Sequence, residues 1–225
     1  MHAPLRGLRA AMIDLDGTLV HTLPDFAVAI NRMLADLCLP ALPEQTIGEM
    51  IGKGSEHLIA QALVLANAQA QPKADFDAAW HSYQTHYAAI NGQYASIYPG
   101  ALEGLRSLQK RGWPLVCLTN KPLAFAQDLL RQKGLDGYFS HVFGGDSFVR
   151  KKPDPLPLLK TCAALGTLPA QTLMLGDSSN DAQAARAAGC PVLLVSYGYN
   201  HGQAASQVDA DGVLDTLADL AHWLA

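Results

Sequence analysis

The sequence has few cysteines, few charged residues and no long apolar run, and each of these absences excludes a class of protein. The cysteines are four among 225 residues, far apart and without a CxxC pair: Cys38, Cys117, Cys162 and Cys190. A disulfide scaffold or a zinc site is therefore not expected. Charged residues make up 16% of the chain, the formal net charge is −4, and no Lys/Arg-rich block is present. We expect no nucleic-acid partner, because binding to a phosphate backbone needs a basic surface.

The apolar run near the N-terminus stops at Asp14, so it is too short for a signal peptide or a membrane span. We expect a soluble cytoplasmic protein with no membrane partner, and nothing in the sequence fixes its oligomeric state. At 225 residues with 49% hydrophobic content, the chain can bury a substantial core. This length fits one large domain or a domain that carries an inserted one.

Short apolar runs alternate with amphipathic helical patterns from Tyr98-Pro99-Gly100 onward. The expected strands lie near residues 8–13, 114–118, 141–143, 172–175, 191–195 and 212–214. The expected helices cover residues 101–111, 123–133, 155–165, 180–188 and 216–224. This alternation predicts an α/β fold whose core is a Rossmann-like parallel sheet flanked by helices on both faces.

A purely helical block separates the first two strands of this pattern. Apolar residues recur at helical spacing over residues 24–38, 58–65 and 76–90, and no strand is expected between Leu23 and Ser96. We therefore expect a core domain formed by residues 1–20 and 97–225, and an inserted small α-helical cap domain formed by residues 21–96. Leu23 and the segment from Ser96 to Pro99 are the expected hinges of the cap.

Polar residues follow four of the expected strands, where open parallel sheets bind their ligands. The segments are Asp14-Leu15-Asp16-Gly17-Thr18, Thr119-Asn120-Lys121-Pro122, Lys151-Lys152-Pro153 and Gly176-Asp177-Ser178-Ser179-Asn180-Asp181. Each segment alone has an ordinary explanation, such as a turn, a helix cap or a solvated loop lysine. All of these explanations would have to hold together for no site to exist, so a shared site is favoured.

The residue types in these segments suit phosphoryl transfer. Carboxylate oxygens from Asp14 and Asp177 favour Mg²⁺, a hard cation that also keeps water ligands. Without a cation, carboxylates at such close quarters would repel one another and hold protons. Lys152 adds positive charge against a phosphate group, and Thr18, Thr119 and Asn120 add neutral donors. One carboxylate can form an aspartyl phosphate while another moves the proton.

The four segments, in this order and with the helical block between the first two, resemble the haloacid dehalogenase superfamily of phosphatases over essentially the whole chain. The resemblance implies that Asp14 is the nucleophile and Asp16 the general acid and base. It implies that Mg²⁺ is held by Asp14, by the Asp16 backbone carbonyl and by Asp177, with Asp181 supporting these ligands. The implied phosphate-binding residues are Gly17, Thr18, Thr119, Asn120 and Lys152, and Lys152 also orients the nucleophile.

The segments at 119–122, 152–155, 176–181, 187–191 and 197–200 more closely resemble the branch of the superfamily that acts on 2-phosphoglycolate. The resemblance thus implies a small phosphorylated metabolite as partner, with 2-phosphoglycolate as the expected substrate. Three alternatives stay open at this point. The chain could be a phosphatase for another small sugar or nucleoside phosphate, a hexose-phosphate mutase, or a catalytically silent phosphate-binding regulator.

Gly52-Lys53-Gly54-Ser55 is a flexible turn with a cation, located in the expected cap before a helix. Our hypothesis is that this turn faces the active site and that Lys53 pairs with the carboxylate of the substrate. The alternative is a solvated lysine at a helix start.

Overall fold

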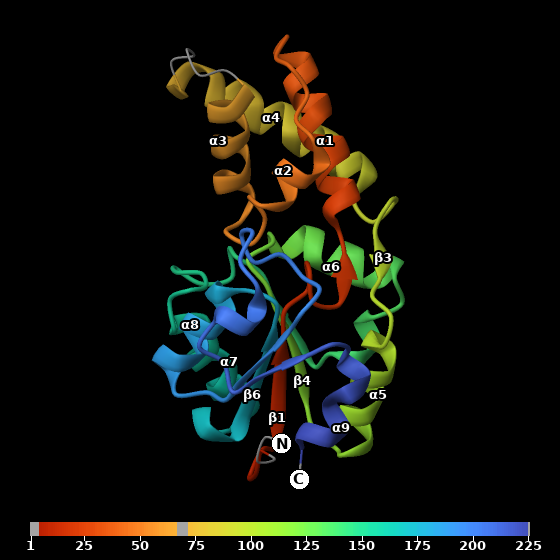
Figure 1. Ribbon diagram of the computed structural model, residues 1–225, viewed down its shortest axis with the longest axis vertical. Coiled ribbons are helices and arrows are strands. Elements are labelled where there is room, and N and C mark those ends of the chain that lie inside the picture. The colour runs from red at the N-terminus through yellow and green to blue at the C-terminus, as the bar shows by residue number, and fades with distance from the viewer. Residues whose placement is uncertain (1–4, 67–71, 225) are drawn as a thin grey trace.

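The computed structural model describes residues 5–66 and 72–224 (Figure 1). One lobe contains a six-stranded sheet with helices against it, and a second lobe contains helices only. The sheet has the order β5-β4-β1-β6-β7-β8, and all neighbouring strands are parallel. Its strands are β1 (Ala10–Ile13), β4 (Leu115–Leu118), β5 (His141–Phe143), β6 (Thr172–Gly176), β7 (Val192–Val195) and β8 (Gly212–Leu214).

The central strands are apolar at nearly every position because helices cover both faces of the sheet. Along β1, Ala11 and Ile13 belong to one hydrophobic cluster and Met12 to another. The first cluster includes residues of α5 (Ala101–Lys110), α6 (Leu123–Gln132) and α9 (Leu220–Trp223). The second includes residues of α7 (Leu156–Leu165) and α8 (Ser179–Ala188).

The order of the strands opens a crevice at the end of β1. The chain runs from β1 to β4 and β5 on one side, and then places β6, β7 and β8 on the other side. Loops that leave the carboxyl ends of β1 and β6 therefore depart in opposite directions, which is the arrangement that leaves room for a ligand in a parallel sheet.

The second lobe, here called the cap, consists of α1 (Leu23–Asp36), α2 (Glu44–Gly48), α3 (Ser55–Ala66) and α4 (Pro72–Ile90). It has its own apolar cluster, which includes Ile30, Met33, Ile59 and Tyr83. Two short strands, β2 (Val20–His21) and β3 (Ser96–Ile97), pair antiparallel where the chain enters and leaves the cap.

The expected fold class is confirmed: the parallel sheet flanked by helices carries a small helical insertion. The division at 20/21 and 96/97 stays a prediction, and both boundaries fall inside the β2–β3 pair. Residues 1–4 of the expected core segment and 67–71 of the expected cap lie outside the described residues. No helix in the described ranges is long and apolar enough to cross a membrane.

One local expectation was wrong. The single helix expected over 216–224 is instead a 3-10 turn, η4 (Leu217–Asp219), followed by the short α9. The Thr216 hydroxyl accepts the Ala218 N–H at 3.4 Å and caps this tight turn, which packs against α5 at Gly104. The sequence patterns also did not single out the short helix from Glu44 to Gly48, which begins directly after Pro43.

Asp25 on α1 joins the cap to its exit segment, and replacing it tests this connection. Its fully buried carboxylate accepts the N–H groups of Gly92 and Tyr94, each at 2.7 Å. Asp25→Asn cannot accept both bonds as well, because the amide presents N–H donors on one side. We expect a loss of about 1–3 kcal/mol in the free energy of unfolding, measured by urea denaturation.

The matched control is Asp36→Asn, at the other end of the same helix, where the carboxylate is exposed and bonds to Ser82 and His86. Its effect on unfolding should be clearly smaller. Equal losses in the two variants would show that the buried bonds of Asp25 do not stabilise the entry and exit of the cap.

Candidate active site

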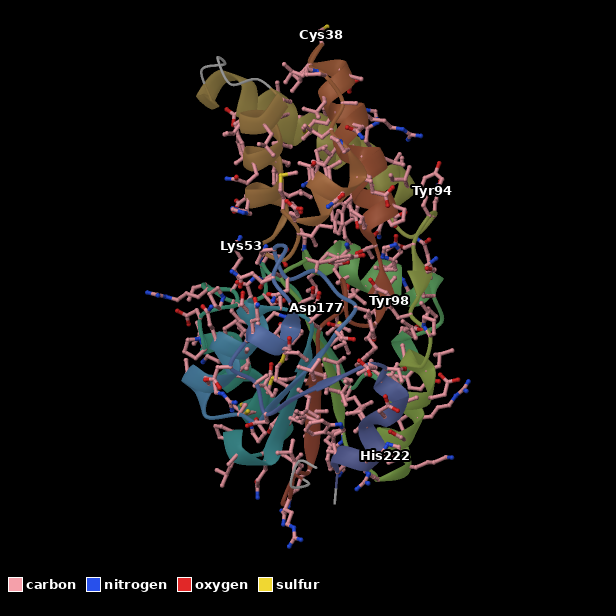
Figure 2. The ribbon with its side chains drawn as sticks, viewed as in Figure 1. Cys38, Lys53, Tyr94, Tyr98, Asp177 and His222 are labelled. Carbon is pink, nitrogen blue, oxygen red and sulfur yellow. The ribbon has the colours of Figure 1, made fainter. Side chains whose placement is uncertain are left out.

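The carboxyl ends of β1 and β6 bring Asp14 and Asp177 to the crevice. Asp14 directly follows β1, and its N–H bonds to the Leu175 carbonyl at 2.9 Å, so the sheet ladder fixes its position. Asp177 directly follows β6 and is buried. Figure 2 shows Asp177 in the middle of the molecule, where the sheet lobe meets the cap.

Three buried carboxylates meet at this point. Asp14, Asp177 and Asp181 each offer one oxygen, and these oxygens all lie within 4.8 Å of one another. Burial raises the pKa of Asp14 to about 7, and burial followed by the charge of Asp181 raises the pKa of Asp177. Buried like charges this close need a compensating cation, and an all-oxygen donor set fits a hard divalent ion.

Lys152 supplies part of the compensating charge. Its Nζ lies 2.7 Å from Asp181 Oδ1 and 3.1 Å from Asp14 Oδ1, and donates to the Leu118 carbonyl at 2.8 Å. Burial alone would lower the pKa of Lys152, but Asp14 and Asp181 outweigh it and keep the pKa above its ordinary value. A permanently charged ammonium therefore contacts one carboxylate oxygen of the expected nucleophile.

Gly17 leaves room for the Asp177 carboxylate, and Thr18 holds it by a hydrogen bond. Gly17 has φ +86, and a Cβ there would lie 2.1 Å from Asp177 Oδ2, so only glycine fits. The Thr18 hydroxyl donates to Asp177 Oδ1 at 3.2 Å, and the Gly17 N–H donates to the Val20 carbonyl at 2.9 Å. Both residues were expected to bind phosphate, and this role stays a prediction; their hydrogen bonds here are to Asp177 and within the turn.

Thr119 and Asn120 follow β4 and line a common cavity with Asp14. Thr119 Oγ1 accepts the Lys121 N–H at 3.2 Å, which leaves its own hydrogen available as a donor. The Asn120 amide donates to the Gly52 carbonyl at 3.0 Å and to the Lys152 carbonyl at 2.8 Å. Asn120 thus connects the loop at Gly52, in the cap, to the loop at Lys152, in the sheet lobe. The N–H that donates to Gly52 can reach a phosphate only after this hydrogen bond breaks.

The cavity that contains these groups lies between the sheet lobe and the cap. Its volume is about 30 Å³, on the order of the room that one or two water molecules need. Asp14, Asp16, Thr119, Asn120 and Lys121 line it from the core. Phe26, Ile51, Gly52, Gly54, Ser55, Leu58 and Tyr87 line it from the cap side. A charged floor thus faces a largely apolar roof.

Lys121 and Tyr199 are contributors that sequence reasoning did not single out. Lys121 Nζ lies 3.0 Å from Asp16 Oδ1, and its position directly after Thr119-Asn120 was the signal that could have revealed it. The Tyr199 N–H donates to Asp177 Oδ2 at 2.5 Å, and its hydroxyl bonds to His21 Nδ1 and to the Leu23 N–H. Tyr199 therefore links the Asp177 carboxylate to the entry of the cap.

Lys53 lies apart from this cavity. It is exposed and lines a second hollow together with Glu56, His57 and Lys151, and Lys152 lines that hollow too. Figure 2 shows Lys53 on the loop at the outer side of the junction between the two lobes. The loop lines the cavity through Gly52 and Gly54 but not through Lys53, and the pairing of Lys53 with a bound substrate stays a prediction.

The raised pKa values generate a prediction about the protein without a divalent cation. Its folded state keeps protons on Asp14 and Asp177 that the unfolded chain releases near the ordinary carboxylate pKa of about 4. The unfolding free energy contributed by these groups therefore falls as the pH rises from about 4 to above about 7. A divalent cation replaces those protons, so it should raise the melting temperature more at about pH 8 than at about pH 5.

Asp177→Asn is the control for this measurement, because it removes one of the buried charges. Both the fall in stability with pH and the response to the cation should be smaller in that variant. An equal response to the cation in both proteins would place the ion elsewhere.

Known proteins resemble this chain over most of its length. The family model of the haloacid dehalogenase-like hydrolases matches residues 8–189. The phosphoglycolate phosphatase of Thiobacillus denitrificans is 43% identical over 95% of this chain and 94% of its own length. The plasmid-borne phosphoglycolate phosphatase of Cupriavidus necator is 45% identical over 94% of this chain and 90% of its own length.

A solved structure is similar to this one over nearly the whole chain. The crystal structure of a predicted phosphoglycolate phosphatase from Haemophilus somnus superimposes with a TM-score of 0.93 at 35% identity, covering 97% of this chain and 98% of that one. The family resemblance inferred from the motifs is confirmed. The chain belongs to the haloacid dehalogenase-like hydrolases.

Proposed function

We propose that this hydrolase cleaves 2-phosphoglycolate to glycolate and phosphate, with Mg²⁺ as cofactor and Asp14 as nucleophile. The observation that carries the proposal is the convergence on one crevice of Asp14, a charged lysine and two further buried carboxylates. The substrate is inferred from relatives named phosphoglycolate phosphatase, which are 43% and 45% identical to this chain over most of its length.

In the first half of the proposed reaction, an Asp14 carboxylate oxygen attacks phosphorus and the bond from phosphorus to the glycolate oxygen breaks. Asp16, which lines the same cavity, gives its proton to the departing glycolate oxygen. Lys152 holds the attacking carboxylate through its 3.1 Å contact with Oδ1 and opposes the charge of the phosphate. The product on the protein is an aspartyl phosphate at Asp14.

In the second half, water attacks phosphorus and the bond to Asp14 breaks, so phosphate leaves and the carboxylate is restored. Asp16, now ionised, takes the proton of the attacking water. Thr119 donates its free hydroxyl hydrogen to a phosphate oxygen, and Asn120 can donate once its bond to Gly52 opens. We propose that Gly17 and Thr18 contribute to phosphate binding through their turn while they position Asp177.

The proposed ligands of Mg²⁺ are Asp14, the Asp16 backbone carbonyl and Asp177, with Asp181 holding the surrounding groups in place. Asp181 Oδ2 accepts the Ser178 hydroxyl at 2.9 Å, and Oδ1 accepts Lys152. When bound, Mg²⁺ neutralises charge on the nucleophile and on the phosphate oxygens. The buried, all-oxygen character of the carboxylate cluster supports a small hard cation over a softer metal.

The residues with which the cap lines the cavity favour a small substrate. The largely apolar roof, which includes Phe26, Ile51 and Leu58, offers few hydrogen-bond partners for the hydroxyl groups of a hexose, as a mutase would need, and so favours a small leaving group. The presence of Asp14, Asp16 and Lys152 together favours catalysis over a silent phosphate-binding protein. We further propose that residues 21–96 move as a lid, since a substrate larger than this cavity enters only when the cap opens.

Phosphate release tests the function directly. With Mg²⁺ present, 2-phosphoglycolate should be hydrolysed, and a chelator should abolish the release. Asp14→Asn should lower kcat by more than about 10³-fold, because the amide cannot act as the nucleophile. Asp136→Asn is the matched control and should keep its activity, because Asp136 is an exposed residue of the sheet lobe.

The melting temperature of Asp14→Asn should show that the variant is folded. β-Glucose 1-phosphate should give neither phosphate release nor isomerisation at a comparable rate. Phosphate release by Asp14→Asn at the rate of the unmodified protein would exclude Asp14 as nucleophile. Isomerisation of the sugar phosphate in preference to hydrolysis of 2-phosphoglycolate would favour a mutase.

A further inference from the structure

We propose that Lys121 determines substrate specificity by binding the carboxylate of the substrate, and that it thereby ties an anionic leaving group to the cap. This inference rests on the proposed function, since it assigns the group that selects 2-phosphoglycolate among phosphate esters. It concerns an ammonium that the proposed chemistry at phosphorus does not use.

Lys121 occupies a buried position between the two lobes. Only 1% of its side chain is exposed, and its Nζ lies 3.0 Å and 3.3 Å from the two Asp16 carboxylate oxygens. The same Nζ donates to the Tyr87 hydroxyl of α4, and it lies 4.5 Å from the Phe26 ring of α1 and 4.8 Å from the Tyr87 ring. A buried cation thus contacts both the proposed acid and the aromatic roof of the cavity.

The covalent structure of 2-phosphoglycolate places its carboxylate near this cation. One methylene separates the carboxylate from the ester oxygen, and that oxygen is the atom to which Asp16 gives its proton. A cation in contact with Asp16 therefore lies next to the carboxylate whenever the ester oxygen is within reach of Asp16. The apolar roof residues Ile51 and Leu58 offer no partner for this charge, so Lys121 is the matching group of the cavity lining.

The other lysines near the site are less suited to this task. Lys152 is committed to Asp14, Asp181 and the Leu118 carbonyl. Lys53 is exposed and lines the second hollow. An arriving carboxylate can replace Asp16 as a partner of the Lys121 ammonium and also accept the hydrogen of the Tyr87 hydroxyl. Asp16, no longer paired with the ammonium, takes up a proton from water and turns to the ester oxygen as the acid, and the substrate connects the core to α4.

The test compares two substrates that differ in one group. 2-Hydroxyethyl phosphate keeps the two-carbon skeleton of 2-phosphoglycolate and replaces the carboxylate with a neutral alcohol. Lys121→Met keeps the length of the side chain and removes its charge. We expect this variant to lower the ratio of kcat/KM for 2-phosphoglycolate to that for 2-hydroxyethyl phosphate by about 10- to 100-fold, mainly through KM.

The ratio separates specificity from support of Asp16, because a loss of that support would slow both esters by the same factor. Lys53→Met is the matched control, and it should leave the ratio unchanged. The inference is overturned if Lys121→Met slows both esters equally, or if Lys53→Met is the variant that lowers the ratio. Lys121→Gln, which can still hydrogen-bond to Asp16 and Tyr87, replaces Lys121→Met if that variant does not fold.

The unmodified protein distinguishes the two proposals. If it releases no phosphate from 2-phosphoglycolate, the proposed function fails, and this inference fails with it. If it hydrolyses 2-phosphoglycolate and 2-hydroxyethyl phosphate with equal kcat/KM, the function stands and the carboxylate-binding role of Lys121 is overturned without any variant.

Discussion

Repulsion among buried carboxylates is the constraint on which the rest of this structure depends. Asp14, Asp177 and Asp181 present oxygens within 4.8 Å of one another, and Lys152 balances only part of their charge. Such a cluster is stable only when it holds protons or a cation. The sheet brings these charges together, because β1 and β6 are neighbouring parallel strands and the carboxylates of Asp14 and Asp177 follow their carboxyl ends. Thr18 and Tyr199 then fix the Asp177 carboxylate by hydrogen bonds. A site with surplus negative charge is prepared for a divalent ion, and through that ion for a phosphate dianion.

Two buried lysines, Lys152 and Lys121, contact different parts of the site. Lys152 belongs wholly to the core, where it contacts Asp14 and Asp181. Lys121 spans the junction, with Asp16 on the core side and the rings of Phe26 and Tyr87 on the cap side. In the proposed reaction, the groups that act on phosphorus come from loops at the carboxyl ends of the strands. The group that recognises the leaving group lies against the cap.

The positions of Asp14 and Asp177 could be predicted from the sequence, because the end of a buried strand is visible as a change from apolar to polar residues. Buried parallel strands are apolar throughout, so Asp14 and Asp177 stand out where their runs stop. The partners of these groups were harder to predict. Whether the Thr18 hydroxyl turns to Asp177 or to a phosphate depends on a turn geometry that the residue type does not determine. The contact of Lys121 with Tyr87 depends on how two lobes pack, which no local pattern encodes.

The central claim is that a divalent ion binds among these carboxylates, and a crystal structure with Mn²⁺ tests it most directly, because Mn²⁺ replaces Mg²⁺ at oxygen sites and scatters anomalously. We predict one strong anomalous peak in contact with the carboxylates of Asp14 and Asp177. The peak should be lost in crystals of Asp177→Asn grown under the same conditions. A cluster free of anomalous density at saturating Mn²⁺, with the carboxylates paired by shared protons instead, would contradict this account.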